Sequence, residues 1–274
     1  MSEQATGVRR AIFITGGGSG IGRAVALYFA ERGWFVGIGD VSEEGMQDTL
    51  GMIEGGFKYS HKLDVRDRDA WDVALKAFST AAGGRIDVVF NNAGIAHGGP
   101  VVDQPTNEVE AVLDVNIKGV IYGAQASHAH LKQTAPGSVL INTASLAGII
   151  GAPNLSVYCA SKWAVRGLTQ SLDAEWAGDG IKVSSLCPGF IDTPIIGQTS
   201  PDSNQTVKET LVDAGVEVSP VSSVPKVVWE AVHGDKLDYT VGKTAGRLLF
   251  LKRWMPGKVR KEMRSQGIGT DLAI

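Results

Sequence analysis

A tyrosine and a lysine four positions apart form the pattern in this sequence that is best suited to proton transfer. Tyr158 and Lys162 share a face if the segment that contains them is helical. A free tyrosine has a pKa of about 10, and a nearby ammonium group favours the phenolate and lowers that pKa. The pair is a candidate acid/base, although an isolated pair at this spacing is more often a contact on a helix surface.

A serine follows one of the β-rich runs of the sequence. Ser145 lies two residues beyond the run 138–143, so its hydroxyl is expected at the carboxyl edge of a sheet. Ligands of open α/β sheets bind outside that edge. There the hydroxyl could donate a hydrogen bond to a substrate oxygen and stabilise charge that develops on it.

A glycine-rich loop separates the first predicted strand from the first predicted helix, in the sequence Thr15-Gly-Gly-Gly-Ser-Gly-Ile-Gly22. Glycine permits a tight turn and close approach of the backbone to a pyrophosphate, which the following helix N-terminus attracts. The loop could be an ordinary turn, but its place in a βαβ unit favours dinucleotide binding. The predicted contacts are Gly16, Gly18, Ser19, Gly20, Ile21 and Gly22.

An aspartate ends the second predicted strand. Asp40 lies 18 residues after Gly22, near the offset of a carboxylate that binds the adenosine ribose hydroxyls. A carboxylate there repels the 2′-phosphate of NADP, and the neighbouring Ser19 and Val41 are uncharged. The sequence therefore predicts NAD as the cofactor. Asp40 could also cap the next helix, which does not exclude the ribose role.

Strand and helix patterns alternate along the chain. Short β-rich runs occur at residues 11–15, 34–40, 57–64, 86–90, 138–143, 182–186 and 238–241. Apolar residues at helical spacing occur between them, at 22–32, 67–82 and 105–131. This alternation predicts an α/β fold, a doubly wound parallel sheet of the Rossmann type with helices on both faces.

Length and composition favour one large globular domain over residues 1–274. The chain is 43% hydrophobic and 20% charged, and its size allows a core without a disulfide or a metal. The only cysteines, Cys159 and Cys187, form no CxxC pair, which indicates a reduced, cytoplasmic protein without a metal site. Residues 1–10 are polar and give no signal-peptide pattern, and no apolar run approaches the ~20 residues of a membrane span.

In this order and spacing the motifs resemble the short-chain dehydrogenase/reductase family, in its subfamily with shorter subunits. The resemblance covers residues 11–193. The residues that carry it are the loop 15–22, Asp64-Val65, Asn91-Asn92-Ala93-Gly94, Asn116, Ser145, Tyr158 with Lys162, and Pro188-Gly189.

The resemblance implies a role for each matched position. Asp64 and Val65 would hold the adenine ring. Asn91, Ala93 and Gly94 would line the cofactor, and Pro188, Gly189, Ile191 and Thr193 would contact its nicotinamide end. Tyr158 would be the acid/base, Lys162 its activator and a ligand of the nicotinamide ribose, and Asn116 the anchor of a water that connects Lys162 to solvent. Turn chemistry at Asn91 and Asn92 and solvent exposure of Asn116 remain open alternatives.

Residues expected to face the substrate are mostly apolar and uncharged: Ala96, His97, Leu146, residues 149–155, Phe190, Ile195 and Ile196. They suit a neutral, fairly hydrophobic secondary alcohol or its ketone. His97 could instead be solvated. Residues 188–223, which hold four of the ten prolines, are expected to form a long loop with a short helix and to act as a lid.

The chain ends in a basic extension, residues 243–274. From Lys236 onward there are nine Lys/Arg against three Asp/Glu, so the rest of the chain carries −9. A solvated helix end or a subunit contact would explain this, as would a membrane-surface or nucleic-acid patch. We expect an amphipathic helix over 247–256 that closes the active site or packs on another subunit. Pro256 argues against a long membrane-bound helix.

The leading hypothesis is an NAD-dependent alcohol dehydrogenase or ketone reductase without a metal, and the resemblance implies a homodimer or homotetramer through the helices of Asn116 and Tyr158. One alternative is an NADP-dependent reductase of bulky ketones. Another is a non-catalytic cofactor-binding scaffold, since fold does not dictate function.

Overall fold

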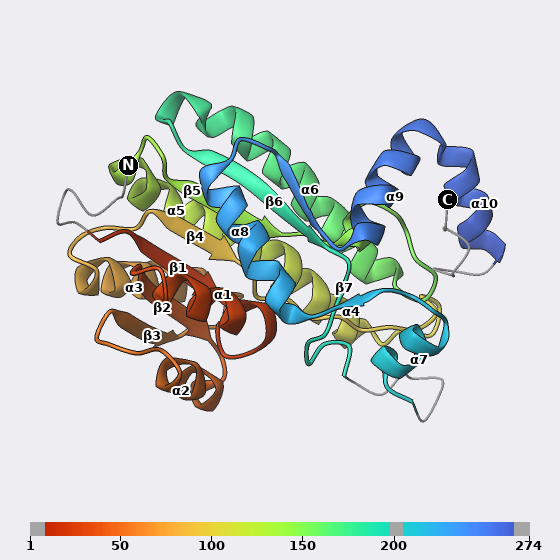
Figure 1. Cartoon of the computed structure of the whole chain (residues 1–274), viewed down its shortest axis with the longest axis horizontal. Helices are drawn as coiled ribbons and strands as arrows, with labels where there is room; N and C mark the ends of the chain where they lie inside the picture. The colour runs from red at the N-terminus through yellow and green to blue at the C-terminus, as the bar shows by residue number, and fades with distance from the viewer. Residues whose placement is uncertain (1–8, 198–204, 266–274) are drawn as a thin grey trace.

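The computed structural model of the chain describes residues 9–197 and 205–265. Its centre is a seven-stranded, wholly parallel sheet in the order β3-β2-β1-β4-β5-β6-β9 (Figure 1). The strands are β1 (Ala11–Thr15), β2 (Phe35–Asp40), β3 (Lys58–Lys62), β4 (Val88–Asn91), β5 (Val139–Thr143), β6 (Lys182–Pro188) and β9 (Asp238–Val241). The strand order reverses between β1 and β4, so the predicted doubly wound sheet is confirmed.

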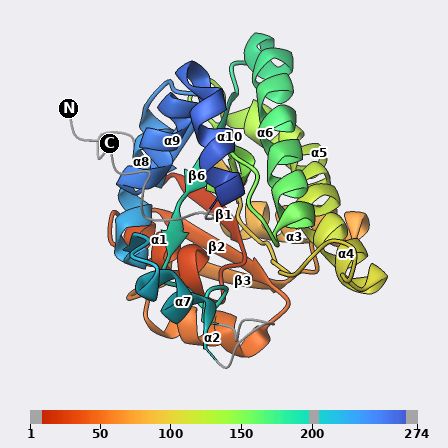
Figure 2. The ribbon, with the colours of Figure 1, turned by 90° about the vertical axis from the view of Figure 1, so that its right-hand side faces the viewer.

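Helices cover both faces of the sheet (Figure 2). One layer contains α1 (Gly20–Ala30) and α8 (Val224–His233), and the other contains α3 (Arg68–Ala81), α5 (Gly119–Thr134) and α6 (Ser156–Trp176). The remaining helices are α2 (Glu43–Gly51), α4 (Thr106–Leu113), α7 (Val207–Asp213), α9 (Lys243–Trp254) and α10 (Pro256–Ser265). Within residues 9–197 and 205–265, short 3₁₀ turns occur at Leu146–Gly148, Ala177–Asp179 and Val221–Ser223.

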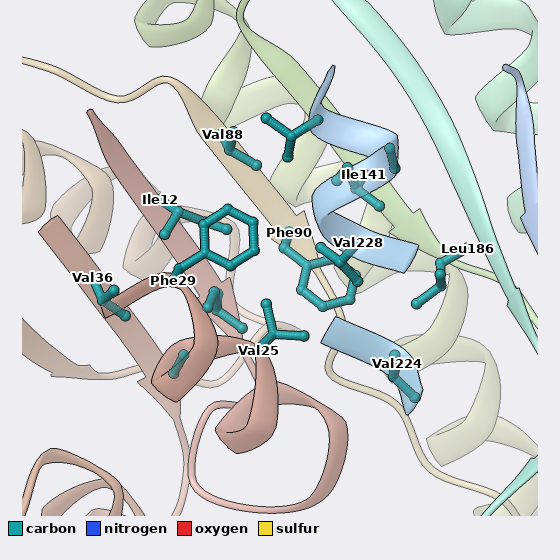
Figure 3. Packing of buried hydrophobic residues seen from close by; sticks show 14 of the residues in the cluster. Ile12, Val25, Phe29, Val36, Val88, Phe90, Ile141, Leu186, Val224 and Val228 are labelled. Atoms are coloured by element: carbon teal, nitrogen blue, oxygen red, sulfur yellow. The ribbon is translucent and has the colours of Figure 1, made fainter. Parts of the chain in front are cut away.

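The core has two halves because successive strand residues point to opposite faces of the sheet. On one side, Ile12, Phe90 and Ile141 pack against Phe29 of α1 and Val228 of α8 (Figure 3). On the other side, Phe13 packs on Phe78 of α3, with ring centroids 5.3 Å apart. Burial on both faces explains why the central strands are continuous apolar runs.

Two regions differ from the sequence-based expectation. The predicted helix over 105–131 is divided, because a π-helical turn at Asp114–Lys118 separates α4 from α5. The region 188–223 contains α7 together with two short strands, β7 (Phe190–Ile191) and β8 (Val218–Ser219), which pair with each other. These strands have two residues each, too few for a recognisable pattern, and residues 198–204 of the expected loop lie outside the described residues.

The basic extension also differs, because Pro256 begins α10 and the described part of the extension is a pair of helices. Among the residues described, no helix is long and apolar enough to cross a membrane.

Candidate active site

A cavity of about 980 Å³ lies at the carboxyl ends of the strands and is lined by the loops that follow β1 to β6. It brings together most of the predicted site residues: Gly16, Ser19, Gly20, Ile21, Asp40, Asp64, Val65, Ala93, Gly94, Ser145, Tyr158, Lys162, Pro188, Gly189, Ile191 and Thr193. Gly18, Gly22, Asn91 and Asn116 do not line it. Each of these four lies next to a lining residue.

The glycine loop leaves the N-terminus of α1 open to the cavity. Gly16 has φ +66°, and a Cβ on Gly22 would lie 2.1 Å from the Gly16 carbonyl oxygen, so both positions require glycine. The first turn of α1 holds no acidic residue, and the side chain of its N-cap, Ser19, accepts no capping hydrogen bond. The free N–H groups and the helix dipole therefore face the cavity, which is the arrangement that binds phosphate.

Asp40 is held against this loop. Its Oδ2 accepts a hydrogen bond from the Gly18 amide at 2.9 Å, and its Oδ1 accepts one from the Ser42 amide at 3.0 Å. The N-cap of α2 is Ser42, whose Oγ accepts from the Gly45 amide at 3.0 Å. The interpretation of Asp40 as a helix cap is therefore wrong, and its carboxylate lines the cavity.

Arg66 also lines this end of the cavity, although the sequence analysis did not single it out. Its guanidinium pairs with Asp64, with Nη2 and Oδ2 2.6 Å apart. The hydrogen bonds from Arg66 lower the pKa of the Asp64 carboxyl below its ordinary value. The sequence alone gives no signal for a role of this arginine, because an arginine after an Asp-Val pair is not a known motif. Its role is apparent only from its contact with Asp64 in the structure.

The segment after β4 presents Asn92 rather than Asn91 to the cavity. Asn91 is 2% exposed, and its Nδ2 donates to Asn142 Oδ1 at 2.9 Å and to the Val120 carbonyl at 3.3 Å. Asn92 is tied to the first loop, because its Nδ2 donates to the Thr15 carbonyl at 3.0 Å. The prediction that Asn91 lines the cofactor is therefore corrected, since its side chain joins β4 to β5 and α5.

Tyr158 and Lys162, both on α6, meet Ser145 at one end of the cavity. Ser145 and Tyr158 both line this end, and the Ser145 side chain is close enough to the Tyr158 hydroxyl to act on its pKa. Lys162 is 3% exposed, its Nζ donates to the Thr143 carbonyl at 2.9 Å, and Nζ lies 5.6 Å from the centroid of the Tyr158 ring. The interpretation of the pair as a contact on a helix surface is therefore wrong.

Burial dominates the ionisation of both groups. It raises the pKa of Tyr158 above its ordinary value, and the nearby Ser145 side chain opposes that rise. Burial also lowers the pKa of Lys162 from 10.5 to about 8. The sequence-based expectation that Lys162 lowers the pKa of Tyr158 includes the positive charge of the bound nicotinamide ring; in the chain alone, Ser145 lowers this pKa and burial outweighs it.

Asn116 lies in the π-helical turn and is completely buried, which excludes solvent exposure as its explanation. Its Oδ1 accepts from the Ile95 amide and its Nδ2 donates to the Ile95 carbonyl, both at 2.9 Å. Nδ2 also donates to Ser161 Oγ at 3.1 Å. Asn116 thus joins the loop after β4 to α6, and the extra residue of the π turn aims its side chain there.

Apart from the groups already described, the wall of the cavity is mainly apolar. Of the residues expected to face substrate, those that line it are Ala96, His97, Leu146, Ile150, Ala152, Leu155, Phe190, Ile195 and Ile196. His97 Nδ1 lies 3.5 Å from Oε2 of Glu108, a lining residue that the sequence analysis missed because the two meet from different elements.

No described residue of 243–265 lines the cavity. Ala245 and Leu248 of α9 and Val259 of α10 pack against Leu146 and Ile149, behind the cavity wall. The described part of the extension therefore does not cover the cleft as expected, because this helix pair packs against the wall from outside. Elsewhere in the described ranges, no cluster of three or more His, Cys, Asp or Glu side chains could hold a metal.

Replacing Lys162 with methionine is expected to stabilise the free protein at pH 7 while abolishing its activity. The depressed pKa means that the fold disfavours the ammonium, and this penalty is fully present below pH 8. The shift in the Lys162 pKa from 10.5 to about 8 corresponds to a destabilisation of the folded protein by about 3 kcal/mol, which the substitution would remove. Loss of the hydrogen bond to Thr143 offsets about 1 kcal/mol of that gain.

Between pH 8 and 10.5 the folded lysine is neutral while the unfolded one is still charged, so the penalty shrinks and the advantage of Lys162→Met falls as pH rises. Urea unfolding of both proteins at pH 7 and pH 10 measures this. A variant that is less stable than the parent at pH 7, or a stability difference independent of pH, contradicts the assignment of a buried, strained ammonium.

Comparisons with known proteins agree with this geometry. A family model described as short chain dehydrogenase matches residues 10–204. The chain is 38% identical over 190 residues to the probable oxidoreductase EphD of Mycobacterium tuberculosis, an alignment that covers 69% of this chain and 32% of EphD, so the chain spans about a third of that relative. It is 33% identical over 235 residues to the 3-oxoacyl-[acyl-carrier-protein] reductase FabG of Thermotoga maritima, over 85% of this chain and 94% of that protein.

Among solved structures, a short chain dehydrogenase/reductase from Burkholderia phymatum in complex with NAD superposes with a TM-score of 0.81. It is 25% identical, and the match covers 93% of this chain and 95% of that one. Structures similar to this chain have been solved with NAD, NADH or NADP, so no single form of the cofactor is common to them.

Proposed function

The chain belongs to the short-chain dehydrogenase/reductase family, and from that premise we propose that it is an NAD-dependent oxidoreductase that interconverts a neutral, fairly hydrophobic secondary alcohol and its ketone. The observation that carries the proposal is one cavity that holds an uncapped helix N-terminus and Asp40 at one end and Ser145, Tyr158 and Lys162 at the other.

The residues present fit a nicotinamide dinucleotide. The open N-terminus of α1 would hold the pyrophosphate, Asp40 the adenosine ribose hydroxyls, and the Asp64-Val65 segment the adenine. Lys162 would bind the nicotinamide ribose. When bound, the cofactor supplies the hydride acceptor in alcohol oxidation and the hydride donor in ketone reduction.

The chain's own residues transfer the proton and stabilise the charge on the substrate oxygen. In oxidation, the Tyr158 phenolate takes the proton of the substrate hydroxyl as the C–H electron pair leaves the same carbon. The Ser145 hydroxyl donates a hydrogen bond to the substrate oxygen and stabilises its developing charge. Lys162, buried behind Tyr158, would favour the phenolate together with the positive nicotinamide ring of the bound cofactor, and Asn116 fixes the loop and the helix that hold the site.

Two features support NAD over NADP. Asp40 presents a carboxylate where a 2′-phosphate would lie, and both of its oxygens are fixed by backbone amides. Arg66 is the one guanidinium among the described lining residues, and it is already paired with Asp64. Arg66 is also the single observation that favours the alternative, an NADP-dependent reductase of bulky ketones.

The proposed substrate class rests on the apolar part of the cavity wall. This part is lined by uncharged, apolar side chains, which suit a neutral, hydrophobic alcohol or ketone. They include Leu146, Ile150, Phe190 and Ile196. FabG of Thermotoga maritima, to which the chain is similar, is named as a reductase of a 3-oxo group. We propose that residues 188–223 act as a lid, since residues of β7 and α7 line the cavity.

Assembly and location are proposals of the same kind. We propose one domain that forms a homodimer or homotetramer through the helices that carry Asn116 and Tyr158. Both cysteines are buried and unpaired, which suits a reducing cytoplasm.

A turnover screen tests the proposed reaction. Purified protein is mixed with NAD⁺ and a panel of secondary alcohols, and in the reverse direction with NADH and the matching ketones, while absorbance at the NADH band is followed. We expect turnover with at least one uncharged, bulky secondary alcohol and much slower turnover with its carboxylate analogue. Turnover confined to charged substrates contradicts the proposed substrate class.

A further inference from the structure

One face of α9 is turned to solvent and carries large apolar side chains. Lys243, Arg247, Phe250 and Trp254 recur at spacings of four, three and four, which places them along one side of the helix. Phe250 is 63% and Trp254 64% exposed, and their ring centroids lie 6.5 Å apart. The exposed Met255 directly after α9 extends the apolar area. Contiguous exposed apolar side chains of this size mark an interaction site.

The neighbouring helix adds positive charge to the same end of the molecule. Lys258, Arg260, Lys261 and Arg264 of α10 are exposed. From Lys243 to Arg264 there are eight Lys/Arg and one acidic residue. The salt bridges between described side chains include none of these eight. We call the exposed surface of these two helices the basic aromatic patch; its residues are Lys243, Arg247, Phe250, Arg253, Trp254, Met255, Lys258, Arg260, Lys261 and Arg264.

The packing of the two helices directs this patch away from the body of the protein. Leu248 and Val259 face the cluster around Leu146 behind the cavity wall. Lys252, on the inner side of α9, donates to the Ile149 carbonyl at 2.5 Å and lies over the Trp163 ring. Figures 1 and 2 show α9 and α10 together at one edge of the molecule. The patch is therefore rigidly held and open to a large, flat partner.

We propose that the basic aromatic patch binds the surface of a bilayer rich in anionic lipids. Aromatic and thioether side chains flanked by Lys and Arg on one helix face are the pattern of interfacial helices, whose apolar side enters the boundary between headgroups and acyl chains. The cations complement lipid phosphates and other anionic headgroups. Because Pro256 begins α10, the proline does not prevent this surface from forming.

The same observations disfavour the other possible occupants. A second copy of the chain on this patch would bring two surfaces of like charge together, which opposes association. A nucleic acid would engage the cations through its phosphates but would leave the apolar ridge of Phe250, Trp254 and Met255 without an equivalent partner.

Vesicle sedimentation tests the proposal, and it requires neither substrate nor cofactor, so its outcome is separate from that of the proposed reaction. The full chain is mixed with phosphatidylcholine vesicles or with vesicles that contain about 30% phosphatidylglycerol. We expect the protein to pellet with the second kind only, and to be released at about 0.5 M salt, where the electrostatic attraction is screened.

Variants of the patch identify the contact. We expect Phe250→Ser/Trp254→Ser and Lys258→Glu/Lys261→Glu each to lower the partition coefficient by about tenfold or more. The matched controls are Met52→Ser/Val73→Ser, just after α2 and on α3, which are 55% and 58% exposed, and Lys76→Glu/Lys226→Glu, which make the same charge reversal on α3 and α8. Both controls should bind as the parent does, and all variants should melt within about 2 °C of it, as surface changes do.

Three results would overturn the proposal. The first is a parent protein that stays in the supernatant with anionic vesicles at low salt. The second is equal binding by the patch variants and the parent. The third is a parent protein that does not bind vesicles but differs from the patch variants in another assay. If only the parent retards a DNA duplex, the patch is a nucleic-acid contact. If only the parent sediments as an oligomer, the patch is a subunit contact.

Discussion

Tyr158→Phe is expected to reduce turnover by about 10³-fold or more while the protein still binds the nicotinamide cofactor. The substitution removes one oxygen, the hydroxyl that we propose exchanges the proton with the substrate. The ring stays in place, because phenylalanine fills the same space beside Lys162. Initial rates with NAD⁺ and the best alcohol of the screen, together with an NADH fluorescence titration, measure the two effects separately.

The dissociation constant for NADH should change by no more than about threefold, which is less than 1 kcal/mol. Tyr28→Phe is the matched control, because it removes the same oxygen from a tyrosine on α1 that does not line the cavity. That control should keep full turnover. A Tyr158→Phe protein with more than a tenth of the parental rate would remove Tyr158 from the mechanism.

Asp40→Asn is expected to shift the preference between cofactors toward NADP by about 10²-fold in the ratio of kcat/KM values. The change removes the negative charge that opposes a 2′-phosphate and weakens the acceptance of ribose hydroxyls. Asparagine has nearly the same shape and keeps one acceptor oxygen for the Gly18 or Ser42 amide, so the loop should hold. The measurement is the pair of kcat/KM values for NAD⁺ and NADP⁺ with one alcohol.

Glu43→Gln is the control for charge alone. Glu43 lies three residues from Asp40, pairs with Lys62 on the surface, and does not line the cavity, so its removal should leave the ratio unchanged. If Asp40→Asn and Glu43→Gln shift the ratio equally, the shift arises from the overall charge of the surface and not from the position of Asp40. If neither shifts it, Asp40 does not select the cofactor.

The sheet could be predicted from the sequence because its strands are chemically distinct from what surrounds them. β1 is a wholly buried run bounded by the glycine loop, and such a run is hard to mistake. The π-helical turn at Asp114–Lys118 could not be predicted, since one extra residue in a helix changes backbone hydrogen bonds while the apolar spacing persists. The strands β7 and β8 pair with each other, and that pairing has no local signal.

The site could be predicted as a set of positions but not as a set of contacts. Motif order places Gly16, Asp40, Ser145 and Tyr158 at one sheet edge, where the cavity lies. Which of two adjacent asparagines faces the cavity depends on the pleat at the end of β4, and the sequence pattern does not record it.

Residues that act through a partner were missed for a similar reason. Arg66 matters because it neutralises Asp64, and Glu108 because it meets His97 from α4. In the chain alone, burial raises the pKa of Tyr158, and the sequence could not indicate this because the spacing of two residues shows a charge nearby but not how deeply both groups are buried.

The most direct test of the central claim is the affinity of the unmodified protein for NADH and for NADPH, measured by paired fluorescence titrations at equal ionic strength. The account predicts saturable binding of both with NADH bound at least about tenfold more tightly, because the Asp40 carboxylate accepts from the ribose and repels the 2′-phosphate. Tighter binding of NADPH would contradict the NAD assignment. Binding of neither would contradict the cofactor site itself.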